Sequence, residues 1–159
     1  MKSSTSEICT EVNRILCEHN KENMFVTTWI GILNTKINVL NFTNAGHNPA
    51  CVLKQGEGFS LVKSRHGLFI AGMDDTQYKQ TEIQLNSGDC VFLYTDGLTE
   101  AHNTNKKIYG EKRLLEKLNS LNMNIGCKKV IEELNYDVDL YAKGTEQFDD
   151  ITLLMIKIL

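Results

Sequence analysis

The sequence has little proline, no excess of basic charge, no paired cysteine motif and no long apolar run, and each absence excludes a class of protein. The single proline, Pro49, leaves no room for a proline-rich linker. The net charge of −3 argues against a nucleic-acid partner. The apolar runs are too short to cross a bilayer, and the first residues precede no apolar segment of the kind found in signal peptides.

Five cysteines are spread along the chain without a Cys-x-x-Cys pair, at Cys9, Cys17, Cys51, Cys90 and Cys127. This spacing argues against a zinc site. We interpret the cysteines as small apolar residues of a reducing interior, which predicts a cytoplasmic protein. The 159 residues suit one domain with a real core, and we expect a single domain over 1–159.

The apolar periodicity predicts both helices and strands. Ser4 and Glu7 have the spacing of a capping box, and the apolar residues that follow predict an amphipathic helix over 6–19, with Ile8, Val12, Ile15 and Leu16 at helical spacing. Further helices are expected from about residue 110 and over 125–140. Strands are expected over 24–33, 37–43, 50–54, 59–62, 81–85, 90–94 and 151–159. Because hairpins join most of these strands, the pattern favours an α+β fold of antiparallel sheets with helices packed outside.

The most informative stretch is the apolar run Cys90–Tyr94, which ends abruptly at Thr95-Asp96-Gly97. The run suits a strand that is covered on both faces. A carboxylate at the end of such a strand is held rigidly and can reach an ion in a cleft. Asp96 could equally cap the turn or short helix that follows, which is a common role for aspartate. A second acidic pair, Asp149-Asp150, precedes the last predicted strand.

Several other titratable residues receive structural interpretations. Asp89, in Asn86-Ser87-Gly88-Asp89, is read as a turn residue without chemistry. His47 could act as a general base or metal ligand, but we favour a role in fixing its loop by hydrogen bonds. The remaining histidines stand in polar contexts and are expected to be solvated: His19, His66 and His102.

Four segments, taken in order, resemble the bacterial metal-dependent serine/threonine protein phosphatases (PPM-type) of the sporulation stage II E and RsbU kind. They are Met24-Phe25-Val26-Thr27, Asn44-Ala45-Gly46-His47-Asn48-Pro49, Tyr94-Thr95-Asp96-Gly97-Leu98-Thr99-Glu100-Ala101 and Asp149-Asp150-Ile151-Thr152-Leu153-Leu154. The resemblance runs from about Ser6 to Leu159. It implies two facing antiparallel sheets with helices over both outer faces.

The resemblance also assigns roles to the acidic residues. Asp96 and Asp149 match the metal-binding aspartates of that family, whereas Asp150 is expected to orient backbone or water. Mn²⁺ and Mg²⁺ are hard cations that prefer such oxygen ligands. Members of the family carry two further acidic motifs and the first strands upstream of the matched region. The chain therefore resembles a domain truncated at its N-terminus, with an incomplete binuclear site.

Two functions follow as hypotheses from this resemblance. The first is a metal-dependent phosphatase that removes phosphate from a regulatory phosphoprotein, for example an anti-sigma-factor antagonist, with an upstream sensor or the missing N-terminal segment as a further partner. The second is a catalytically incomplete binding or regulatory module, suggested by the missing acidic motifs. A third, weaker hypothesis is that another chain completes an exposed sheet edge.

Overall fold

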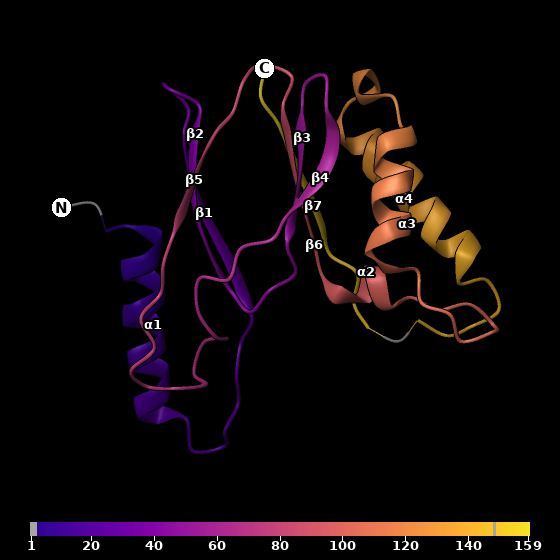
Figure 1. Ribbon diagram of the computed structural model, residues 1–159. Helices are drawn as coiled ribbons and strands as arrows, with labels where there is room; N and C mark the ends of the chain where they lie inside the picture. Colours follow the sequence, from indigo (N-terminus) through magenta and orange to yellow (C-terminus); the bar gives the residue numbers. More distant parts are fainter. Residues whose placement is uncertain (1–2, 148) are drawn as a thin grey trace. The chain divides into compact units, whose positions relative to one another are not determined.

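The computed structural model describes residues 3–147 and 149–159, and the contacts divide the chain into two compact units. Unit 1 lies within residues 1–49 and 63–85, and unit 2 within 50–62 and 86–159. We describe each unit by itself, with the element labels of Figure 1. Among the described residues, no helix has both the length and the apolar character needed to cross a membrane.

Unit 1 is a three-stranded antiparallel sheet with one helix on it (Figure 1). The strand order is β1-β2-β5, and its elements are α1 (Thr5–His19), β1 (Thr28–Asn34), β2 (Val39–Ala45) and β5 (Thr81–Gln84). The predicted hairpin is confirmed, since β1 and β2 pair from Thr28 opposite Ala45 to Asn34 opposite Val39. The capping box is confirmed as well, because Ser4 and Glu7 exchange both of its hydrogen bonds.

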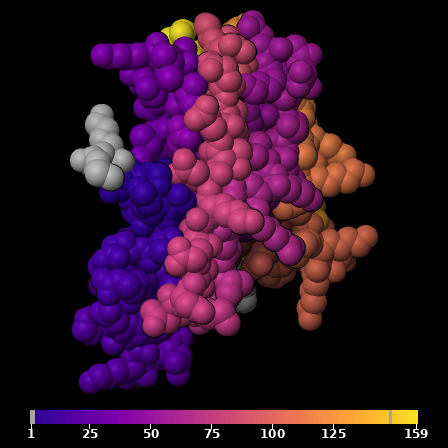
Figure 2. Space-filling model, turned by 60° about the vertical axis from the view of Figure 1, so that its left-hand side comes forward, coloured from indigo at the N-terminus to yellow at the C-terminus, as the bar shows by residue number. Residues whose placement is uncertain are grey.

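Helix α1 turns a largely polar stripe toward the rest of unit 1, with Cys9 as its apolar member. Its buried residues are Thr5, Cys9 and Asn13, while the apolar residues that predicted the helix are more exposed, with Val12, Ile15 and Leu16 each near 40%. The Asn13 side chain holds the following loop, since it donates to Met73 O and Asp74 O and accepts from Ala71 N. Figure 2 shows α1 in indigo beside the pink segment of residues 71–80 that these hydrogen bonds attach. Hydrogen bonds therefore fix the helix here together with the burial of Cys9 in an apolar cluster with Ala45, Ile70 and Tyr78.

The strand predicted over 24–33 was wrong at its start. Residues 24–27 lie outside β1, and only Val26 forms a bridge, with Ile70. The ring of Phe25 contacts that of Phe69 in a tilted arrangement, with a centroid separation of 4.6 Å, although Phe25 is 58% exposed. The β-prone composition of this segment indicated a strand, but its backbone instead runs along the loop that contains Phe69 and Ile70.

The expectation that His66 is solvated was wrong. His66 is only 6% exposed, its Nδ1 accepts a hydrogen bond from Asn44 N at 3.0 Å, and its Nε2 lies 2.8 Å from Thr81 Oγ1. Burial lowers the pKa of His66 below its ordinary value. The acceptor role of Nδ1 requires the neutral ring, so protonation would break the bond to Asn44.

This histidine predicts a pH dependence of stability. The pKa of His66 is lower in the folded state than in the unfolded state. Its contribution to the free energy of unfolding is therefore complete above the unfolded pKa of about 6.5 and is lost as the pH falls through the folded pKa. We expect the free energy of unfolding to decrease between pH 7 and pH 5. The part of this decrease that comes from His66 should disappear in His66→Phe. The variant His19→Phe, which alters an exposed residue, should show the same decrease as the unaltered protein. Urea unfolding at several pH values tests this prediction. It would be contradicted if the free energy of unfolding of His66→Phe fell with pH as steeply as that of the unaltered protein.

Unit 2 is a four-stranded antiparallel sheet of order β4-β3-β6-β7, covered on one face by helices (Figure 1). Its elements are β3 (Ala50–Lys54), β4 (Gly58–Val62), β6 (Cys90–Tyr94), α2 (Asp96–Glu100), α3 (Gly110–Ser120), a 3₁₀ turn η1 (Met123–Ile125), α4 (Cys127–Tyr141) and β7 (Leu153–Lys157). Three alternate residues of β6 pack against the leucines and valines of α3 and α4. These β6 residues are Cys90, Phe92 and Tyr94. The strands predicted over 50–54 and 90–94 are confirmed, and the last strand is shorter than the predicted 151–159.

Asp89 is a turn residue, as expected, but it is also a buried anchor. Its backbone N–H donates to Asn86 O in the turn before β6. Its carboxylate is 1% exposed and accepts from Lys54 Nζ, Gln55 N and Asn86 N at 2.9 to 3.0 Å. Burial disfavours the charged form, yet these hydrogen bonds outweigh it and hold the pKa of Asp89 below its ordinary value. The residue therefore ties the end of β3 to the start of β6.

Candidate metal centre

Asp96 lies directly after β6, at the start of α2. The residue in the N-cap position is Thr95, with an extended backbone, so Asp96 is the first helical residue and not its cap. The Asp96 side chain is exposed and Oδ1 accepts from the next backbone N–H, that of Gly97, at 3.0 Å. A carboxylate in the first helical turn is favoured by the helix dipole, and most of its oxygen lone pairs still face solvent.

Asp149 lies just before β7, and the pairing of β6 with β7 brings it to the same end of the sheet. The two strands are antiparallel with Tyr94 opposite Leu153, so the residues after Tyr94 adjoin those before Leu153. Asp149 is exposed, and its Oδ1 accepts from Asp150 N at 2.7 Å. Each aspartate thus holds its own following N–H and leaves its other oxygen to solvent.

We call residues 95–97 and 149–152 the β6–β7 corner. Thr95 joins its two halves, since its Oγ1 donates to Asp150 O at 2.8 Å and accepts from Thr152 N at 2.9 Å, and its own N–H donates to Thr152 O at 3.1 Å. Figure 1 shows α2 beside the chain that leads into β7. The hydroxyl of Thr95 therefore fixes the backbone on which both aspartates sit.

Gly97 permits the close approach of the two halves. It is buried, and a Cβ added to it would lie 2.6 Å from Asp150 O and 3.0 Å from Asp149 O. Any larger residue at this position would push these carbonyl groups away. The Asp-Gly pair of the sequence thus combines an exposed carboxylate with a backbone contact to the second acidic segment.

Replacing Gly97 by alanine tests this contact. We expect Gly97→Ala to lower the free energy of unfolding by roughly 1 to 3 kcal/mol, because the new methyl group overpacks against backbone that cannot rotate away. The expected loss should be visible in urea unfolding, with Glu100→Ala as a control at an exposed position of the same helix. Unfolding of Gly97→Ala at the same urea concentration as the unaltered protein would contradict the close approach.

The donor set at the corner partly fits a hard divalent cation. Two exposed carboxylates from adjoining segments supply the oxygen ligands that Mn²⁺ and Mg²⁺ prefer. Within residues 3–147 and 149–159, however, no group of three or more His, Cys, Asp or Glu side chains is placed to hold a metal ion. The two carboxylates of the corner are fewer than the oxygen ligands that such an ion takes, so on their own they would hold it weakly.

His47 belongs to a loop that is held by a neighbouring side chain. Asn44 Oδ1 accepts from His47 N at 2.8 Å, and Asn44 Nδ2 donates to His47 O at 2.9 Å. The imidazole Nδ1 is 3.3 Å from Asn48 O. The Asn44 side chain therefore holds the loop through the backbone of His47, and the role of the imidazole in fixing the loop stays a prediction.

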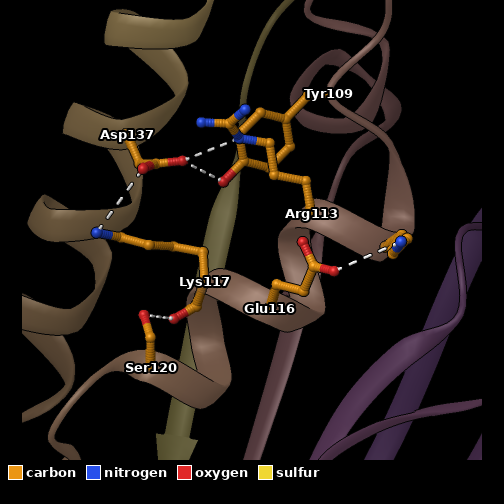
Figure 3. A pocket seen from close by; sticks show the side chains of 7 residues that line it. Tyr109, Arg113, Glu116, Lys117, Ser120 and Asp137 are labelled. Atoms are coloured by element: carbon orange, nitrogen blue, oxygen red, sulfur yellow. Dashed lines mark hydrogen bonds and ion pairs between the residues drawn. The ribbon is translucent and has the colours of Figure 1, made fainter.

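Two pockets of unit 2 carried no recognisable signal in the sequence. One is an open pocket of about 460 Å³ on α3 and α4 (Figure 3). There Arg113 lies over the rings of Tyr109 and Tyr141, while Asp137 accepts from the Tyr109 hydroxyl and pairs with Arg113 and Lys117. Because Asp137 of α4 pairs with two cations of α3, we interpret the cluster as a contact that holds α3 against α4. The other pocket adjoins the β6–β7 corner and is described below.

The chain matches the sequence model of the family described as Stage II sporulation protein E (SpoIIE) over residues 2–159. It is 28% identical over 143 residues to protein IcfG of Synechocystis sp., covering 89% of this chain and 22% of IcfG. It is 26% identical over 152 residues to phosphoserine phosphatase RsbU of Bacillus subtilis, covering 96% of this chain and 44% of RsbU. The chain therefore spans less than half the length of each of these relatives.

Solved structures of similar fold come from several bacteria. The SiaA-PP2C domain of Pseudomonas aeruginosa superposes with a TM-score of 0.71 at 18% identity, covering 96% of this chain and 70% of that one. The RsbU and RsbW domains of Rv1364c from Mycobacterium tuberculosis superpose with a TM-score of 0.71 at 23% identity, covering 98% of this chain and 42% of that one. A phosphatase-domain structure of SpoIIE from Bacillus subtilis, described as Mn presoaked, superposes with a TM-score of 0.65 at 20% identity, covering 83% of this chain and 56% of that one. These likenesses confirm an α+β fold with antiparallel sheets and helices, while the facing of the sheets stays a prediction.

Proposed function

The chain belongs to the stage II sporulation protein E family, and from that premise we propose that it is a metal-dependent serine/threonine protein phosphatase domain. The observation that carries the proposal is the close approach at the β6–β7 corner. Gly97 brings the Asp96 segment against the carbonyl groups of Asp149 and Asp150. The backbone segments that carry the two family-matched aspartates therefore adjoin, although they are far apart in the sequence.

In this proposal Asp96 and Asp149 hold the ion, Thr95 fixes their backbone, and Gly97 sets the spacing of the two segments. When bound, Mn²⁺ or Mg²⁺ supplies charge stabilisation for a phosphoryl group and lowers the pKa of water. Hydrolysis breaks the bond between phosphorus and the serine oxygen, forms one to a water oxygen, and returns a proton to the serine. No cysteine of this chain is needed as a nucleophile, and burial raises the pKa of the Cys51 thiol to about 12 and that of Cys90 to about 11.

The proposed substrate is a cytoplasmic regulatory phosphoprotein, with an anti-sigma-factor antagonist as one example. The support is that RsbU of Bacillus subtilis, a 26% identical relative, is named a phosphoserine phosphatase. The chain spans 22% of IcfG and 44% of RsbU, and we include an N-terminal segment or sensor domain as a proposed partner that would complete the metal site.

Phosphate release from a phosphoserine peptide tests the enzyme proposal. We expect release with Mn²⁺ that stops when EDTA removes the ion, with this chain or with a longer protein that includes an upstream segment. Failure of both to release phosphate at saturating Mn²⁺ would contradict the proposal.

The second candidate is a non-catalytic binding or regulatory module. It is favoured by one observation, namely that the described residues place no group of three or more His, Cys, Asp or Glu side chains where it could hold a metal ion. For this function we expect binding of a phosphoprotein without release of phosphate, with or without Mn²⁺. The same assay therefore separates the two functions.

A further inference from the structure

A cavity of about 270 Å³ lies in unit 2 beside the β6–β7 corner. We call it the corner cavity. Its walls come from the end of α2, the end of α4 and the segment that leads to Asp149, and its lining includes Gly97, Ala101, Val138, Ala142, Glu146 and Ile151. Gly97 and Ile151 belong both to this lining and to the corner, and Gln147 Nε2, also from the lining, donates to Asp149 O at 2.8 Å. The cavity and the candidate metal centre thus share backbone.

The floor of the corner cavity is formed by the apolar members of its lining. Val138 is buried, and Ala101, Ala142 and Ile151 are partly buried. Thr145 fixes the wall, since its Oγ1 donates to His102 O at 2.8 Å. Pockets for drug-sized ligands measure roughly 300 to 1,000 Å³, so this one suits a single side chain better than a nucleotide or a cofactor.

The rim of the corner cavity is acidic. Asp139 and Glu146 are exposed there, with Lys143 as the basic residue. Across the described part of the chain, neither acid is engaged in an ion pair within 4 Å. Segments 96–102 and 138–151 together contain six acidic residues and one basic residue. A cation bound at Asp96 and Asp149 would still leave acids in excess around the rim.

We propose that the corner cavity binds a lysine or arginine side chain of the phosphoprotein substrate, at a position near its phosphoserine. This inference rests on the proposed phosphatase function. An apolar floor accommodates the aliphatic stem of such a side chain, and an acidic rim attracts its charged end. A shorter or acidic side chain would lose one or both of these contacts. The cavity would thereby select among phosphoproteins that reach the same metal centre.

Phosphopeptides that carry lysine or alanine at each position near the phosphoserine test this inference. At one position we expect lysine to raise kcat/KM about fivefold to tenfold, since it gains two partly exposed ionic contacts and the burial of its stem. The preference should fall as salt is added. In the double variant Asp139→Asn with Glu146→Gln it should shrink to less than twofold, whereas Glu132→Gln with Glu133→Gln, two exposed acids of α4 outside the cavity, should leave it unchanged.

Binding of the same peptides, measured by fluorescence anisotropy in Mn²⁺, separates this inference from the proposed function. A lysine preference in binding that disappears in the Asp139→Asn, Glu146→Gln variant supports the cavity even if no phosphate is released. Equal binding and equal rates for lysine and alanine peptides overturn it, whether or not the protein is an active phosphatase. A preference that survives in the double variant and in Ala142→Leu, which fills the floor, also overturns it.

Discussion

Asp96→Asn should lower Mn²⁺-dependent hydrolysis of a phosphoserine peptide by about 100-fold or more, as expected for the loss of a charged group that stabilises the reacting phosphoryl group through a metal. The substitution keeps the size of the side chain and an oxygen that can still accept from Gly97 N. The fold should therefore survive, and the loss should appear in the rate. Phosphate release at saturating peptide and a fixed Mn²⁺ concentration measures it.

Two neighbouring acids serve as controls for this prediction. Glu100 is exposed in the same short helix, and Asp150 follows Asp149 in the corner. We expect Glu100→Gln and Asp150→Asn to change the rate by less than about tenfold, the lower end of the effect expected when a group around the ligands is altered. Asp149→Asn should lower the hydrolysis rate as much as Asp96→Asn does. A normal rate for Asp96→Asn would remove this residue from the metal site.

Asp89→Ala should destabilise the fold by about 3 kcal/mol, because a buried carboxylate with three donors is removed. The backbone N–H groups of Gln55 and Asn86 lose their acceptor, and Lys54 loses this partner. Urea unfolding measures the change. Glu57→Ala, an exposed acid in the nearby β3–β4 turn, should change stability by less than about 0.5 kcal/mol.

The same carboxylate predicts a dependence on acid. The folded pKa of Asp89 lies below its ordinary value. Its contribution to the free energy of unfolding is therefore complete above the unfolded pKa of about 3.9 and is lost as the pH falls through the folded pKa. The difference in stability between the unaltered protein and Asp89→Ala should therefore narrow below about pH 4. A difference that stays constant down to pH 2 would contradict the ionised state of Asp89.

Local patterns predicted the elements whose own residues determine them. The capping box of Ser4 and Glu7 fixed the start of α1, and the apolar run Cys90–Tyr94 matched β6 from end to end. Turn residues located the β1–β2 and β3–β4 hairpins. The last strand and α4 differ from their predicted ranges by one or two residues at their ends, where local propensity is weakest.

The errors have a common physical cause, namely contacts between residues far apart in the chain. His66 stands in a polar stretch, and its burial is made favourable by distant residues, namely the hydrogen-bonding partners Asn44 and Thr81 and the ring of Phe42. The polar stripe of α1 is buried because Asn13 meets the backbone of a loop 58 to 61 residues later. Such partners leave no periodic signal in the local sequence, so propensity alone cannot show which face of a helix is covered.

The sequence named the residues of the candidate site, whose role stays a prediction, but it could not give their geometry. An acid after one strand and another before a second strand could be recognised from the sequence. The family resemblance alone joined them, because a separation of more than fifty residues says nothing about distance in space. The antiparallel register of β6 with β7, and the space left by the missing Cβ of Gly97, bring the two segments together.

Calorimetric titration with Mn²⁺ of the unaltered protein, Asp96→Asn, Asp149→Asn and the double variant tests the central claim most directly. If both carboxylates hold one ion, each single substitution should weaken binding by about tenfold or more, and the double variant should lose much less than the product of the two effects. Unchanged affinity in either single variant, or two losses that multiply in full, would contradict a shared ion at the β6–β7 corner.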